Sequence, residues 1–167
     1  PGVMPIVQST TYRFDSSEHI AALFDMPTEP MYSRFANPTC DAVEKKIAAL
    51  EGGVGAMLTS SGQAASLLSI LNLCKAGDHL VSVSAIYGGT LNLLAFSLKK
   101  LGISCTFVQP DATDAEIQAA IQPNTRLVFG ETIANPTLKI FDIERFAAVA
   151  HRNQIPLIVD NTFATPL

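Results

Sequence analysis

The feature that most constrains the fold is an alternation of short strand-like runs and longer helical patterns, which begins at residue 54. The strand-like runs cover residues 54–59, 79–84, 103–109, 125–131 and 155–160. The helical patterns between them cover residues 63–75, 90–101, 113–121 and 142–152, and Thr113 with Glu116 has the spacing of a capping box. Because this order implies right-handed βαβ crossovers, the sequence predicts an α/β fold with a mostly parallel sheet and helices on both faces.

Residues 1–53 follow a different pattern. They combine an extended start, a short helix with Ile20, Leu23 and Phe24 on one face, a proline-rich loop, and a second helix that begins at Thr39. So few core positions indicate an arm that packs on the main domain or on another subunit. We therefore expect two parts: residues 1–53 as an N-terminal arm with helices, and residues 54–167 as the first part of an α/β domain. Since the chain begins at a proline and stops soon after its last strand, we expect a fragment of a longer protein.

Composition argues against several classes of protein. With 48% hydrophobic and 16% charged residues, the 167-residue chain can bury a core and is not disordered. A net charge of −4 argues against nucleic acid as a partner. The three cysteines form no C-x-x-C pair, which indicates reduced thiols and a cytoplasmic location, and the three scattered histidines argue against a structural metal site. The uncharged stretches 52–74 and 80–98 are interrupted by glycines and polar residues, so we expect strands and helices there rather than membrane spans.

Polar and glycine-rich segments follow several predicted strands, at the edge where an open α/β sheet binds its ligands. Ser60, Ser61, Gly62 and Gln63 lead from the first run into a helix, and backbone N–H groups at a helix start can hold an anion. A serine N-cap at an ordinary turn explains the same residues equally well. The segment lacks the G-x-G-x-x-G, Walker A and G-x-S-x-G patterns, which argues against a dinucleotide-binding protein, a P-loop NTPase and an α/β-hydrolase.

Two further strand ends carry candidate binding residues. Tyr87, followed by Gly88 and Gly89, can stack on a planar ligand, although a capping turn with a half-buried tyrosine is the simpler explanation of these residues alone. Asp160 ends an apolar run, where a carboxylate either pairs with a cation or forms an ordinary Asx turn. Together, these segments predict a flat, aromatic ligand with a phosphate group and a protonatable ring nitrogen. Pyridoxal 5′-phosphate (PLP) has those properties.

Over essentially its whole length, the sequence resembles the fold-type-I PLP enzymes of cysteine and methionine metabolism. The resemblance rests on ordered segments: Tyr32-Ser33-Arg34-Phe35-Ala36-Asn37-Pro38-Thr39, Ser61-Gly62-Gln63-Ala64-Ala65, Tyr87-Gly88-Gly89-Thr90, Glu131 with Asn135-Pro136, and Asp160-Asn161-Thr162-Phe163. Within the family the motifs are most similar to those of O-acetylhomoserine sulfhydrylases, whereas methionine γ-lyases carry a cysteine at the position of Gly89. The resemblance implies that residues 54–167 begin a PLP-binding domain, and that the protein forms a homo-oligomer, a homotetramer, with active sites shared between subunits.

The resemblance also implies roles for individual residues around the cofactor. Ser61, Gly62 and Gln63 would hold the phosphate. Tyr87 would stack on the pyridine ring and take part in proton transfer as the catalytic residue of this chain. Asp160 would pair with the ring nitrogen and keep it protonated, which makes the cofactor an electron sink.

Further roles follow from the same resemblance. Asn135 would lie near the phenolic oxygen of the ring, with Glu131 and Thr162 in supporting positions. Tyr32 and Arg34 would reach the phosphate of a neighbouring subunit, although on its own the Arg34 loop is equally a solvated turn with one exposed charge.

The lysine that such chemistry needs for its Schiff base is missing from these motifs. The lysines of the chain are Lys45, Lys46, Lys75, Lys99, Lys100 and Lys139. None of them has the serine- and threonine-rich context of the family's lysine, so we expect that lysine to come after residue 167.

The resemblance therefore implies a PLP-dependent transferase that replaces the acetate of O-acetylhomoserine by sulfide or a thiol, with a small amino acid as substrate. Methionine γ-lyase and cystathionine γ-synthase are the alternatives within the family. If the protein is not an enzyme, the alternative is a non-catalytic α/β fragment that binds a phosphorylated ligand or serves as an assembly surface.

Overall fold

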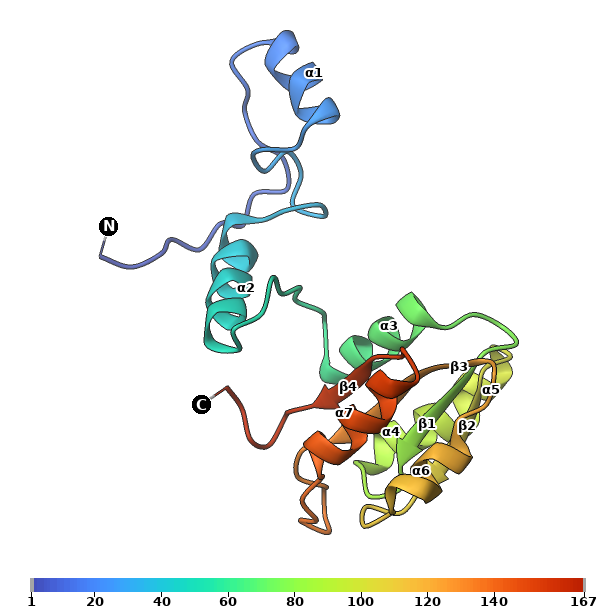
Figure 1. Cartoon of the computed structure of the whole chain (residues 1–167). Coiled ribbons are helices and arrows are strands. Elements are labelled where there is room, and N and C mark those ends of the chain that lie inside the picture. Colours follow the sequence, from blue (N-terminus) through green and yellow to red (C-terminus); the bar gives the residue numbers. More distant parts are fainter. Residues whose placement is uncertain (1, 167) are drawn as a thin grey trace. The chain divides into compact units, whose positions relative to one another are not determined.

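The computed structural model describes residues 2–166 of the chain (Figure 1). The chain divides into two compact units, and the boundary lies between Leu58 and Thr59. The first unit contains the helices α1 (Ser17–Asp25) and α2 (Pro38–Leu50). The second unit contains a four-stranded sheet and all the other helices of the described chain.

The first unit has very little core of its own. Its two helices begin at side-chain caps, provided by Ser16 for α1 and by Asn37 for α2. An antiparallel bridge between Thr11 and Tyr32 joins the start of the chain to the loop between the helices. Leu23 is the only buried hydrophobic residue among the described residues of this unit. A unit with a single buried hydrophobic residue gains little stability from its own hydrophobic burial.

The second unit is built on a parallel sheet, which confirms the predicted fold class. Its strands are β1 (His79–Val83), β2 (Ser104–Val108), β3 (Thr125–Glu131) and β4 (Leu157–Asp160). They lie in the order β2-β1-β3-β4, and every neighbouring pair is parallel.

The prediction of a further strand at residues 54–59 is wrong. This segment pairs with no strand within residues 2–166, and the side chains of Val54, Met57 and Leu58 are exposed. Instead of joining a sheet, the Leu58 N–H donates to the Glu44 carboxylate at 2.7 Å. An apolar run predicts a tendency to be buried, but a strand also needs a neighbouring strand for its N–H and C=O groups, and the run itself does not specify one.

Helices lie on both faces of the sheet, as predicted. α3 (Gly62–Leu73) precedes β1, and α4 (Gly88–Asn92), the π-helix η1 (Leu93–Ser97) and α5 (Leu98–Lys100) form one run between β1 and β2. α6 (Asp114–Ala120) and α7 (Ile143–Arg152) follow β2 and β3, and the capping box of Thr113 and Glu116 is present at α6. From β1 the chain crosses to β2 on one side of it, whereas the crossovers from β2 to β3 and from β3 to β4 run toward the opposite edge of the sheet. Because these crossovers are right-handed, α6 and α7 lie on the face opposite the α4–α5 run. α6 and α7 contact each other on their face.

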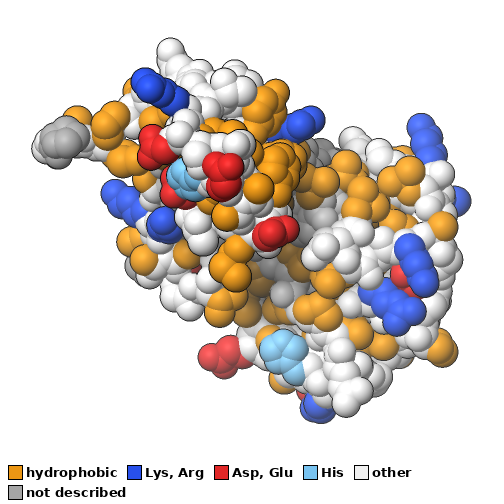
Figure 2. Space-filling model, turned by 90° about the horizontal axis from the view of Figure 1, so that it is seen from above, with side chains coloured by type: hydrophobic (Ala, Val, Ile, Leu, Met, Phe, Trp, Pro, Cys, Tyr) orange, Lys and Arg blue, Asp and Glu red, His pale blue; other side chains and the backbone are white. Residues whose placement is uncertain are grey.

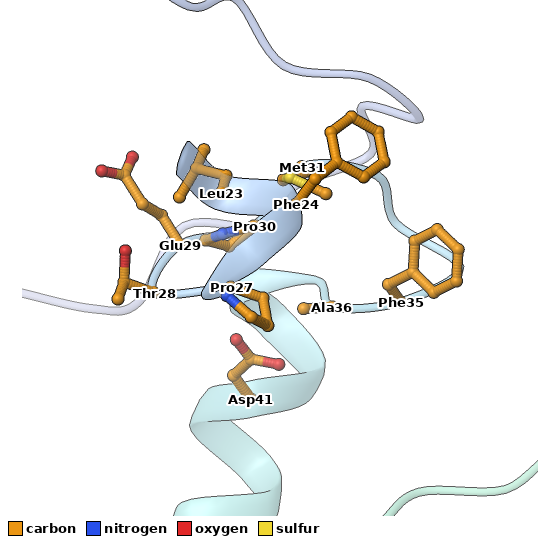
Figure 3. Close-up of a pocket in the computed structure, with 10 residues that line it drawn as sticks. All are labelled: Leu23, Phe24, Pro27, Thr28, Glu29, Pro30, Met31, Phe35, Ala36 and Asp41. Atoms are coloured by element: carbon orange, nitrogen blue, oxygen red, sulfur yellow. The ribbon is translucent and has the colours of Figure 1, made fainter. Parts of the chain in front are cut away.

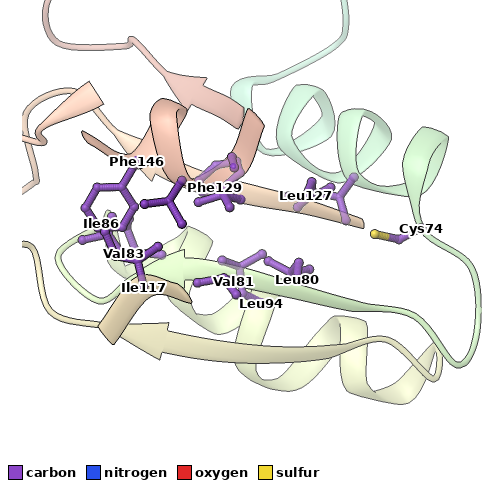
Figure 4. Close-up of a cluster of buried hydrophobic side chains, with 14 of the residues drawn as sticks. Cys74, Leu80, Val81, Val83, Ile86, Leu94, Ile117, Leu127, Phe129 and Phe146 are labelled. Carbon is purple, nitrogen blue, oxygen red and sulfur yellow. The ribbon is translucent and has the colours of Figure 1, made fainter. Parts of the chain in front are cut away.

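The core lies around the two central strands (Figure 4). It contains Leu80, Val81 and Val83 of β1, Leu127, Val128 and Phe129 of β3, and side chains from the helices that include Ile70, Leu94, Ile117 and Phe146. β1 is buried along its whole length, whereas β4 at the sheet edge is half-buried. Because the connections from β1 and β3 leave in opposite directions, the carboxyl ends of these strands form the crevice where such sheets bind ligands.

Candidate active site

A pocket of about 240 Å³ lies between α3 and the end of β4. It is lined by Gly62, Ala65, Ser66 and Ser69 from α3, by Phe129 from β3, and by Ile158, Val159, Asp160, Asn161 and Thr162 from β4 and the turn after it. Three residues that the sequence analysis assigned to cofactor binding, Gly62, Asp160 and Thr162, therefore share one pocket.

The start of α3 offers backbone donors to this pocket. The Ser61 hydroxyl caps the helix by accepting the N–H of Ala64 at 3.1 Å, so the predicted N-cap is present. The Gln63 amide donates to the Thr90 hydroxyl at 3.0 Å and so ties the start of α3 to α4. A Cβ on Gly62 would meet no atom within 4 Å, which leaves its surroundings open. The Ser61 cap uses the N–H of Ala64, so the N–H groups of Gly62 and Gln63, together with the helix dipole, remain to hold an anion.

Tyr87 is held at its backbone and along its ring. Its N–H donates to the Glu131 carboxylate at 2.5 Å, and its side chain is half-exposed. The ring lies against Gly89, because a Cβ at that position would be 2.5 Å from the ring's Cε1. Tyr87 precedes α4 without forming a side-chain cap, so its ring remains available for another contact.

Asp160 forms the Asx turn that the sequence analysis considered. Its Oδ1 accepts the N–H of Thr162 at 3.1 Å and the Thr162 hydroxyl at 2.5 Å. Its Oδ2 has no hydrogen-bond partner within residues 2–166. The turn fixes the carboxylate through one oxygen and leaves the other for a ligand in the pocket. The Asx turn and a cation-binding role are therefore compatible here.

Glu131, predicted only as a supporting residue, has direct contacts with other residues of the site. The carboxylate is buried at the end of β3, and the parallel register pairs Glu131 with Asp160 of β4. Burial raises the pKa of Glu131, the backbone N–H of Tyr87 opposes this, and the negative charge of Asp160 raises the pKa further. The backbone N–H of Asn135 also favours the ionised form and lowers the pKa. Glu131 thus connects the Tyr87 turn to the strand pair that carries Asp160, and an acidic residue at the end of an apolar strand was the available signal.

Tyr32 and Arg34, which were predicted to bind the phosphate of a neighbouring subunit, lie in the first unit. The Arg34 guanidinium lies 5.1 Å from the centre of the Tyr32 ring and 5.2 Å from that of Phe35, at cation–π distance. Within the part of the chain that the structure describes, Arg34 forms no salt bridge. It is exposed, so its charge is available to an anion.

The first unit also has a hydrophobic pocket of about 480 Å³ (Figure 3). Its lining residues come from α1, the loop after it and the first turn of α2, and include Phe24, Phe35 and Asp41. Figure 2 shows hydrophobic side chains, in orange, on the surface of the molecule. Phe24 and Phe35 of this pocket are both exposed.

Neither a metal site nor a membrane span is found in the described chain. Residues 2–166 contain no group of three or more histidine, cysteine or acidic side chains that could hold a metal ion. No described helix has both the length and the hydrophobicity that crossing a bilayer requires.

Comparisons with known proteins extend over nearly the whole chain. A family profile described as "Cys/Met metabolism PLP-dependent enzyme" matches residues 2–167. The chain is 52% identical to the O-acetyl-L-homoserine sulfhydrylase of Corynebacterium glutamicum, over 97% of this chain and 37% of that protein. It is 44% identical to the homocysteine/cysteine synthase of Kluyveromyces lactis, over 98% of this chain and 37% of that protein.

A solved structure is similar as well. The crystal structure of a putative O-acetylhomoserine (thiol)-lyase from Campylobacter jejuni matches with a TM-score of 0.91 and 36% identity, over 98% of this chain and 40% of that chain. That protein contains N′-pyridoxyl-lysine-5′-monophosphate. The present chain thus spans less than half the length of these relatives.

Proposed function

Because the chain belongs to the Cys/Met metabolism PLP-dependent enzyme family, we propose that the protein carrying it replaces the acetate group of O-acetylhomoserine by sulfide or a thiol. The products would be acetate and homocysteine, or methionine where the thiol is methanethiol. The observation that carries this proposal is the identity of more than half of the aligned residues to an O-acetyl-L-homoserine sulfhydrylase.

The residues around the pocket fit PLP. A pocket of about 240 Å³ lies just below the range of about 300–1,000 Å³ that suits drug-sized ligands, as expected for a ligand with a single ring. The backbone N–H groups at Gly62 and Gln63 would hold the phosphate, with Ser61 fixing the helix start. The free Oδ2 of Asp160 would pair with the ring nitrogen. Bound PLP supplies an electron sink for negative charge that develops on the substrate.

The remaining roles follow the family resemblance. Tyr87 would stack on the ring and move a proton through its hydroxyl, and Asn135 would bond the phenolic oxygen. Thr162 holds Asp160 Oδ1 with both its N–H and its hydroxyl, so it keeps the other carboxylate oxygen oriented. Glu131 holds the Tyr87 backbone from the neighbouring strand end.

We also propose that the active site is shared between subunits of a homotetramer in the cytoplasm. Residues 1–53 would form the arm that contacts the neighbour, and residues 54–167 would begin the PLP-binding domain. The guanidinium of Arg34 is exposed, forms no salt bridge within residues 2–166 and lies at cation–π distance from Tyr32 and Phe35, which supports a role in binding the neighbouring subunit's phosphate. The small buried core of the first unit supports its packing against another surface.

The test is a comparison of reactions catalysed by the intact protein with PLP. O-acetylhomoserine and sulfide should give homocysteine much faster than methionine alone gives a ketoacid, or than O-acetylhomoserine and cysteine give cystathionine. A dominant release of ketoacid from methionine would favour methionine γ-lyase, and dominant cystathionine formation would favour cystathionine γ-synthase. PLP binding without turnover of any of these substrates would favour the non-catalytic alternative.

A further inference from the structure

Glu131 is a buried charge without a cationic partner in the described chain. The buried acidic residues of that part are Asp78 and Glu131, and only Glu131 lies at the carboxyl ends of the strands. Asp78 has a guanidinium partner, since Arg126 Nε lies 3.0 Å from its Oδ1. Glu131 instead accepts the backbone N–H of Tyr87. A buried carboxylate is costly to keep ionised, so its place at the ligand edge indicates a task that an apolar residue would not perform.

The N–H group that Glu131 accepts comes from the turn after a different strand. Tyr87 belongs to the turn between β1 and α4, whereas Glu131 ends β3. On the other side, Glu131 pairs with Asp160 in the β3–β4 ladder. Paired residues of a parallel ladder point their side chains to the same face, so both carboxylates lie on one side of the sheet. One side chain therefore connects the turn after β1 to the strand pair that ends at Glu131 and Asp160.

We propose that Glu131 is the positioning residue of this site: its carboxylate holds the Tyr87 turn in place relative to Asp160. This inference rests on the proposed function, since Tyr87 and Asp160 are residues assigned to the PLP ring. The Tyr87 ring lies against Gly89 of the same turn, so a displacement of this turn would move the ring as well. Misplacement of a reacting group by about 1 Å can reduce a rate about 100-fold.

The charges around Glu131 add a coupling to ligand binding. The negative charge of Asp160 raises the pKa of Glu131, and a cationic ring nitrogen bound at Asp160 would offset that repulsion. PLP binding should then favour ionised Glu131 and strengthen its hydrogen bond to the Tyr87 N–H. The positioning contact and the cofactor thus support each other.

The first test uses the small number of tyrosines. Tyr12, Tyr32 and Tyr87 are the only ones in the chain, so ¹⁵N-tyrosine labelling adds three backbone amide signals from this part of the protein. We expect the Tyr87 signal, assigned with Tyr87→Phe, to move with pH as Glu131 titrates, and that transition to move to lower pH when PLP is added. In Glu131→Gln the pH dependence should disappear. A Tyr87 signal that does not respond to pH in the wild type, or that responds identically in Glu131→Gln, would overturn the proposal.

The second test compares kinetics with a matched control. Glu131→Gln should lower kcat by about 10-fold or more per folded molecule, while the Kd for PLP changes by less than about threefold. The control is Glu116→Gln, which removes a carboxylate that accepts the Thr113 N–H at 2.8 Å at the start of α6. It should leave both quantities unchanged. Equal kcat values for the two variants would contradict positioning by Glu131. If the wild type does not convert O-acetylhomoserine, the proposed function fails, whereas the tyrosine signals still decide on Glu131.

Discussion

His79 should make the stability of the protein fall in mildly acidic solution. Its ring is fully buried at the start of β1. Nδ1 lies 2.7 Å from the Thr125 hydroxyl, and Nε2 lies 2.9 Å from the Thr106 hydroxyl and 3.3 Å from the Gln122 amide nitrogen. Because an amide nitrogen only donates, Nε2 must accept, and the proton of the neutral ring is on Nδ1. A second proton on Nε2 would face the N–H groups of Gln122.

The direction and size of the effect follow from linkage. Burial lowers the pKa of His79 below the value of about 6.5 that an unfolded chain has. Between the two pKa values the unfolded state binds one proton more than the folded state, so unfolding takes up a proton. The free energy of unfolding should therefore fall as the pH drops below about 6.5, by at most about 1.4 kcal/mol per pH unit from this residue. Above about pH 6.5, His79 contributes no pH dependence.

Urea unfolding followed by circular dichroism, between about pH 5 and pH 8, measures this effect. The matched variant is His79→Gln, which keeps a hydrogen-bonding side chain but does not titrate. Subtracting its free energy of unfolding from that of the wild type cancels other titrating groups, such as Glu131, whose pKa is raised. The difference should change below about pH 6.5 and be constant above it. A difference that stays constant over the whole range would refute the argument that burial keeps His79 neutral.

Three further predictions concern the site and its support. Asp160→Asn should lower kcat of the intact enzyme about 100-fold or more while changing stability by about 1 kcal/mol, and near-normal turnover at saturating PLP would remove the pyridine-nitrogen role. Gly130→Ala should destabilise the protein by about 1–3 kcal/mol in urea unfolding, because its methyl group would overlap the Phe141 ring, and Phe141→Leu should recover part of that loss. Gly89→Ala should displace the Tyr87 ring and lower kcat about 10-fold or more with little change in melting temperature; unchanged kcat would show that the ring position is not critical.

Local sequence patterns were sufficient for most elements of the second unit. The runs at residues 79–84, 103–109, 125–131 and 155–160 correspond to β1–β4, and the four helical patterns correspond to observed helices. Thr113 and Glu116 could be paired from their spacing alone, since a capping box is completed within one helical turn. Residues 54–59 have the same apolar character but no ladder partner in the described chain. What distinguishes residues 54–59 from the four strands is the lack of a partner strand. Strand pairing joins residues that are far apart in the sequence, so the composition of a single run does not encode it.

The site could be predicted in part for a related reason. Serine at the start of a helix and aspartate at the end of a strand have local consequences, and the Ser61 cap and the Asp160 turn are both present. The partner of the Gln63 side chain was not predictable in this way, because Thr90 lies 27 positions away on another helix. The sequence thus predicted which residues lie at these turns. It did not predict which of their atoms remain free to bind a ligand.

The position of Glu131 shows which further step of reasoning was available. Tyr87 is 44 positions from Glu131, and the chain forms β2 between them, so no local pattern joins the two residues. Their contact depends on β3 lying beside β1 rather than beside β2. In that strand order the turns after β1 and β3 meet at the point where the connections reverse direction. A carboxylate that ends one of these two strands is then within reach of the turn that follows the other. The family resemblance was sufficient to select Glu131 as a supporting residue. Its contact with the Tyr87 turn could be predicted only by combining strand order with residue type at the strand ends.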